Sequence, residues 1–166
     1  MGWEIERRFL VRVPVESWPP NGKGHHLKQG YVRHGNPSVR IRTGEPRGPV
    51  LTCKSGTGIR RSEVEAVVTE EVAAALFEAA GDHVLEKVRF PLGGWTLDRF
   101  LGDLDGLALL EIELQSEDEE LPEPPKLVQV LREVTNDKRF VSGRLAALEP
   151  KERRKWVKKA YKEAEG

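Results

Sequence analysis

The sequence has 166 residues, about one domain, of which 38% are apolar and 33% are charged. Lys plus Arg and Asp plus Glu number 27 each, so net charge does not favour nucleic acid or an anionic membrane, and neither is expected as a partner. The single cysteine excludes an intramolecular disulfide and a four-cysteine zinc site. Because no apolar run resembles a signal peptide or a membrane span, we expect a cytoplasmic protein.

Alternation of charged and apolar residues predicts strands, because successive side chains of a strand point to opposite faces. In chain order, these segments are residues 3–10, 38–43, 50–54, 63–65, 87–90, 95–100 and 110–114. Turns rich in Gly and Pro separate several of them. The spacing predicts an antiparallel meander that is closed or nearly closed.

Four segments are predicted to be helical. They are residues 69–80, 122–134, 143–148 and 150–165. The first has Thr69 as its N-cap and Gly81 just past its end, whereas the second begins among prolines. The last is strongly basic with one aromatic stripe, so we predict one domain over residues 1–148 and a C-terminal helix over 149–166 that packs on the barrel or caps it.

The polar faces of these strands are unusual because they carry charges of one sign at positions i and i+2. The pairs are Glu4/Glu6, Arg40/Arg42, Glu63/Glu65, Lys87/Arg89 and Glu111/Glu113. For any single strand, a solvated face is the simpler interpretation. Like charges at this spacing point the same way and repel, however, so their recurrence favours an interior site that binds a polyanion together with cations.

Both signs of charge suit one class of ligand. A triphosphate needs Arg and Lys as donors to its oxygens, and the Mg²⁺ or Mn²⁺ that accompanies it needs carboxylate oxygens. Zinc is not expected, because no clustered set of Cys and His is present.

The start of the chain, residues 4–8, resembles the ExExK motif of the CYTH superfamily, the triphosphate tunnel metalloenzymes. Further segments resemble the family in order: residues 29–31, 39–42, 51–54, 61–65, 86–89, 95–100, 110–114 and 133–140. The resemblance implies an α+β fold in which an eight-stranded antiparallel β-barrel forms an open-ended tunnel with surrounding helices. It also implies Mg²⁺- or Mn²⁺-dependent hydrolysis, with inorganic tripolyphosphate as the expected substrate, giving pyrophosphate and phosphate.

The same resemblance assigns roles by position. Phosphate would be bound by Arg8, Arg40, Arg42, Lys54, Lys87 and Arg89. Metal would be bound by Glu4, Glu6, Glu63, Glu65, Asp98, Glu111 and Glu113, with Asp98 supporting that wall. The catalytic set would be Glu4, Glu6, Glu111, Glu113 and Lys87. The expected partner is a small molecule that contains a triphosphate, bound by a monomer or homodimer.

One position departs from the family motif, because Arg8 stands where the motif has lysine. Arginine keeps the charge but does not accept a proton near neutral pH, since its pKa exceeds about 12. Three alternatives to hydrolysis therefore stay open: a class IV-like adenylate cyclase, a non-catalytic module that binds polyphosphate or nucleoside triphosphate, and a structural barrel whose charges pair with one another.

Overall fold

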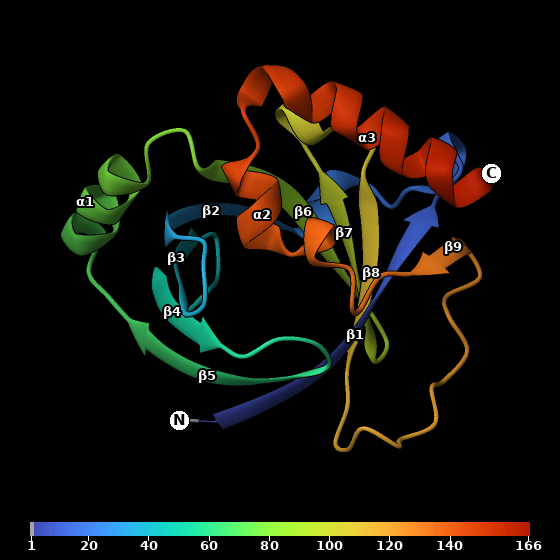
Figure 1. Cartoon of the computed structure of the whole chain (residues 1–166), viewed down its shortest axis with the longest axis horizontal. Coiled ribbons are helices and arrows are strands. Elements are labelled where there is room, and N and C mark those ends of the chain that lie inside the picture. The colour runs from blue at the N-terminus through green and yellow to red at the C-terminus, as the bar shows by residue number, and fades with distance from the viewer. Residues whose placement is uncertain (1) are drawn as a thin grey trace.

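The computed structural model describes residues 2–166, which form one antiparallel sheet with helices around it (Figure 1). The strands are β1 (Gly2–Arg12), β2 (His25–Arg33), β3 (Ser38–Thr43), β4 (Val50–Ser55), β5 (Arg60–Val67), β6 (Val84–Leu92), β7 (Trp95–Phe100), β8 (Ala108–Glu113) and β9 (Gln129–Glu133). The helices are α1 (Glu70–Ala80), α2 (Ser142–Ala147) and α3 (Pro150–Glu165). Short 3₁₀ turns are η1 (Val15–Ser17), η2 (Asn21–Lys23), η3 (Gly102–Leu104) and η4 (Lys138–Phe140).

The sheet closes into a barrel of eight strands. Its order is β5-β4-β3-β2-β6-β7-β8-β1-β9, and β1 also pairs with β5. Closure is possible because β1 is long: residues 2–5 pair with β5, residues 6–10 pair with β8 along the other edge, and residues 9–12 pair with β9. The predicted eight-stranded antiparallel barrel is confirmed, with β9 as an additional strand.

Two elements differ from the sequence-based prediction. β2 does not show charge alternation, because Leu27, Gln29 and Tyr31 occupy its buried positions. The predicted helix over residues 122–134 is wrong: residues 121–128 form coil and a turn, and β9 follows. Prolines at the start of this segment disfavour helix, and the free edge of β1 offers backbone partners that β9 satisfies.

The first predicted helix is confirmed as α1. The Thr69 hydroxyl accepts a hydrogen bond from the backbone N–H of Val72 at 3.1 Å, so it caps the first turn. Gly81 ends the helix with a φ of 58°, which glycine adopts without strain. α1 packs on β2 and β3, where Gly30 leaves room for the Phe77 ring.

The inner face of the barrel changes from charged to apolar along several strands. Side chains two residues apart in a strand share a face. Leu10 follows Arg8, Phe100 follows Asp98 and Leu109 precedes Glu111 at this spacing, so all three lie on the inner face. These apolar side chains belong to a buried cluster with Phe140 of η4, Leu145 of α2 and Val157 of α3. We call this cluster the apolar floor, because it fills one end of the barrel and leaves the charged cavity at the other.

The C-terminal helix α3 packs against this floor, on the side of the barrel away from the chain's N-terminus (Figure 1). The Tyr161 hydroxyl donates to the Val11 carbonyl at 2.7 Å and accepts from the Ala108 N–H at 2.9 Å. The Arg153 guanidinium donates to four backbone carbonyls between Asp82 and Leu148. Within residues 2–166, no side chain of α3 lines the charged cavity, and no helix is long and apolar enough to cross a membrane.

Candidate active site

A cavity of about 540 Å³ lies inside the barrel, and charged side chains dominate its lining. Its basic residues are Arg8, Arg40, Arg42, Arg47, Lys54, Arg61, Lys87 and Arg89. Its carboxylates are Glu4, Glu6, Glu63, Glu65, Glu111 and Glu113. The structure thus brings together every predicted phosphate-binding residue and every predicted metal-binding residue except Asp98.

The two signs are separated on opposite sides of the barrel. All six carboxylates come from β8, β1 and β5, which are neighbours in the closed sheet, and we call this side the acidic wall. Most of the cations come from β4, β3 and β6, and we call the residues Arg40, Arg42, Lys54, Lys87 and Arg89 the basic wall. The strand order produces this separation, because β8, β1 and β5 are consecutive in the closed sheet. The two walls meet where Lys54 of β4 lies opposite Glu63 of β5.

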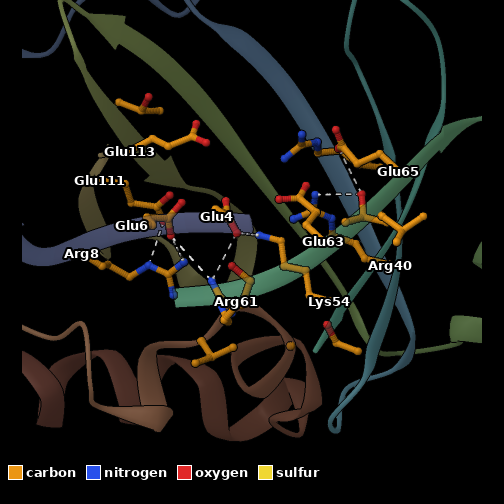
Figure 2. A pocket seen from close by; sticks show the side chains of 18 of the residues that line it. Glu4, Glu6, Arg8, Arg40, Lys54, Arg61, Glu63, Glu65, Glu111 and Glu113 are labelled. Atoms are coloured by element: carbon orange, nitrogen blue, oxygen red, sulfur yellow. Dashed lines mark hydrogen bonds and ion pairs between the residues drawn. The ribbon is translucent and has the colours of Figure 1, made fainter. Parts of the chain in front are cut away.

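Arg8 and Arg61 lie within the acidic wall (Figure 2). The Arg8 guanidinium donates to Glu111 Oε1 at 2.9 Å, to Glu6 Oε1 at 3.0 Å and to the Phe140 carbonyl at 2.9 Å. Burial lowers the pKa of Arg8, but Glu111 and Glu6 more than offset it, so the pKa is raised. Arg8 therefore remains a cation and joins the acidic wall to the floor.

Glu63 and Glu113 are carboxylates without a cationic partner. Among the described residues, no Lys, Arg or His nitrogen lies within ion-pair distance of either one. Burial raises the pKa of both carboxyls, the charge of Lys54 opposes the rise, and the negative charge of Glu4 adds to it. This part of the acidic wall lacks a close counter-charge, which a divalent cation would supply.

Glu4 faces the basic wall across the cavity. Its Oε2 forms an ion pair with Lys54 Nζ at 2.9 Å. Burial opposes ionisation of Glu4, yet Lys54 holds the pKa of the carboxyl below its ordinary value. The pair joins the two walls (Figure 2).

Asp98 supports the basic wall from behind. Its carboxylate is fully buried and accepts from Lys87 Nζ at 2.6 Å and from Arg89 Nε and Nη2 at 2.8 Å each. Burial would raise the pKa of Asp98, but the two cations hold it well below the ordinary range. Both oxygens of Asp98 are engaged by the basic wall, and Asp98 is not among the residues that line the cavity. It thus lies behind the predicted phosphate-binding cations, whereas the sequence predicted it to support the metal-binding carboxylates.

The basic wall is only partly neutralised. Arg40 donates to the Thr52 hydroxyl at 3.2 Å, and Arg42 pairs with Glu45. The Nε groups of both arginines are buried and have no hydrogen-bond partner. Burial lowers the pKa of Arg42, and the nearby charge of Arg40 lowers it further. Burial likewise lowers the pKa of Lys87 to about 8. An anion in this cavity would find donors already in place.

Comparison with known proteins places the chain in a family. No family model matches it. It is 34% identical to an inorganic triphosphatase of Acetivibrio thermocellus over 151 residues, which cover 87% of this chain and 94% of the relative. It is 34% identical to an inorganic triphosphatase of Nitrosomonas europaea over 153 residues, which cover 86% and 96%. The chain belongs to the inorganic triphosphatase family.

A solved structure of the inorganic triphosphatase NE1496 resembles this fold as well. It matches with a TM-score of 0.57 and 33% identity over 89% of this chain and 99% of the other. The resemblance of the sequence motifs to triphosphate tunnel metalloenzymes is thereby confirmed. The roles of individual residues in this member of the inorganic triphosphatases stay predictions.

Sequence analysis did not single out two cations of this inorganic triphosphatase cavity. Arg61 Nη2 lies 3.9 Å from both Glu4 Oε2 and Glu6 Oε1, and extending the alternation of Glu63 and Glu65 by two residues would have found it. Arg47 lies in the turn after β3, where no periodicity exists to predict its direction. Ser142 and Gly143 of α2 also line the cavity, and only tertiary packing brings them there.

Proposed function

We propose that this protein hydrolyses inorganic tripolyphosphate to pyrophosphate and phosphate and uses Mg²⁺ or Mn²⁺ to do so. The observation that carries the proposal is the cavity with a basic wall and an acidic wall on opposite sides. A triphosphate bound with a divalent cation presents both signs of charge at once, and this cavity is complementary to it. Relatives that are named inorganic triphosphatases support the same conclusion.

The basic wall would hold the phosphates. Arg40 and Arg42 line the cavity, and each has an Nε without a hydrogen-bond partner, so their guanidinium groups are not saturated and could donate to phosphate oxygens. Arg89 is fixed by its two bonds to Asp98, which orients its remaining donors before a ligand arrives. Such preorganised cations are what phosphoryl transfer mainly needs, because the reaction depends on alignment and charge neutralisation.

The acidic wall would hold the cation. Glu63 and Glu113 are unpaired carboxylates, and hard divalent cations prefer oxygen ligands. Within residues 2–166, no group of three or more His, Cys, Asp or Glu side chains is already gathered for a metal, so substrate oxygens and water would complete the coordination. When bound, such a cation neutralises phosphate charge and makes a bound water more acidic.

Lys87 is the residue of the chain best placed to assist the leaving pyrophosphate. Its Nζ is held by Asp98 and lines the cavity, and burial lowers its pKa to about 8. A lysine with a pKa near neutrality can donate a hydrogen bond or a proton to an oxygen that gains charge. Arg8 lacks this ability, since its raised pKa keeps it protonated.

The activity is tested with the purified protein, tripolyphosphate or ATP, and added Mg²⁺ or Mn²⁺ or a chelator. We expect metal-dependent release of phosphate and pyrophosphate from tripolyphosphate. Release of cyclic AMP and pyrophosphate from ATP, with tripolyphosphate untouched, would instead favour the cyclase alternative. Tight binding of tripolyphosphate without turnover under every metal condition would leave only the binding module.

A further inference from the structure

The turn between β3 and β4 places a carboxylate at the mouth of the phosphate-binding cavity. Gly44 has a φ of 106°, and a Cβ at this position would lie 2.0 Å from the His26 carbonyl oxygen, so the turn folds tightly onto β2. The Gly48 N–H donates to the Glu45 carbonyl at 3.1 Å and closes the turn. The backbone thus holds Glu45 in place at the end of β3, next to the basic wall.

Glu45 binds two cations of the cavity. Its carboxylate pairs with Arg42 of the basic wall and accepts from Arg47 Nε at 3.1 Å. Arg47 in turn reaches Glu65 of the acidic wall at 3.2 Å. The Glu45 side chain is only 19% exposed, and although burial opposes ionisation, Arg42 and Arg47 lower its pKa. A negative charge that belongs to the protein therefore occupies a position that a phosphate would otherwise favour.

A second cavity continues outward past Glu45. It has a volume of about 400 Å³, and we call it the outer cavity; His25, Leu27, Glu45, Pro46, Arg47 and Arg89 line it. Arg47 and Arg89 line both cavities, so the outer cavity adjoins the main one at these two side chains, and its own exposed lining is mostly apolar. Because the apolar floor fills the opposite end of the barrel, a polyphosphate too long for the main cavity would extend in this direction.

We propose that Glu45 sets the length of the polyphosphate that the cavity accepts, by repelling a fourth phosphate that would enter the outer cavity. This inference rests on the proposed triphosphatase function. A tripolyphosphate uses the basic wall without entering the outer cavity, whereas tetrapolyphosphate places additional negative charge beside the Glu45 carboxylate. Without that charge, Arg42, Arg47 and Arg89 would together attract the fourth phosphate.

The test compares hydrolysis of tripolyphosphate and tetrapolyphosphate by the wild-type protein and by Glu45→Gln. Glutamine keeps the size of the side chain and removes its charge. We expect the ratio of kcat/KM for tetrapolyphosphate to that for tripolyphosphate to rise at least about tenfold, as one like-charge contact in a half-buried site is removed. Glu45→Asp retains the charge and should keep a ratio close to that of the wild type.

The matched control is Glu163→Gln, since Glu163 is also a carboxylate paired with an arginine but lies on α3, where no side chain lines the cavity. For Glu163→Gln, the ratio of kcat/KM for tetrapolyphosphate to that for tripolyphosphate should equal the wild-type ratio. A cooperative melting transition should confirm that each variant is folded. An unchanged ratio in a folded Glu45→Gln, with tripolyphosphate still cleaved, would overturn the role of Glu45 and leave the proposed function standing. Failure of the wild type to cleave tripolyphosphate would refute the function itself.

Discussion

Replacing Asp98 with asparagine should strongly destabilise the protein, because it removes the counter-charge of two cations in the basic wall. Asp98 is 0% exposed, and the side chains of Lys87 and Arg89 are 2% and 25% exposed. Breaking a buried ion pair by removing one partner costs about 3–5 kcal/mol, since the other charge remains buried. Water can reach part of Arg89, so we expect the free energy of unfolding to fall by about 3 kcal/mol.

Urea denaturation followed by tryptophan fluorescence measures this loss, which corresponds to a midpoint lowered by roughly 1–2 M urea. The pKa of Asp98 is held below its ordinary value of 3.8, so its stabilisation is present above that pH and is lost as the pH falls through the lower folded-state pKa. The difference between wild type and Asp98→Asn should therefore shrink as the solution is acidified below about pH 4.

The matched control is Asp137→Asn, because Asp137 also pairs with two arginines, Arg132 and Arg139, but at the surface. Its removal should cost less than about 1 kcal/mol. A loss of under about 1 kcal/mol in Asp98→Asn, no larger than that of the control, would refute the reasoning about the buried network.

Three further predictions concern the cavity. Binding of tripolyphosphate should weaken as the pH rises through about 8, because Lys87 then loses its proton and its charge; calorimetric titration should show this step in the wild type and not in Lys87→Met. Glu113→Gln should raise the Mg²⁺ or Mn²⁺ concentration for half-maximal turnover at least about tenfold, and an unchanged value would argue against Glu113 as a metal ligand. Arg8→Lys should lower the free energy of unfolding by about 1–2 kcal/mol, because an ammonium does not reach Glu6, Glu111 and the Phe140 carbonyl together; melting at the wild-type temperature would contradict this.

The sequence by itself determined which side chains face the cavity. Alternation has a period of two in any strand, so pairs such as Glu4/Glu6 and Arg40/Arg42 share a face whatever the rest of the chain does. The repulsion between like charges then indicated that this face binds ligand. All twelve Glu, Lys and Arg side chains predicted for the site line one cavity, because closing the barrel places every such face inside.

Only the tertiary structure decided which of these charges are neutralised and by what. A strand, β9, forms where a helix was predicted, because it pairs with residues 9–12 of β1. The sequence of residues 122–134 does not indicate this pairing. Asp98 supports the basic wall because the register sets it opposite Arg89. Glu45 lies in a turn, where side-chain direction follows from φ angles and from contacts with neighbours such as Arg42 and Arg47. Periodicity fixes direction within a strand, whereas pairing between strands and turns depends on distances that arise only when the barrel closes.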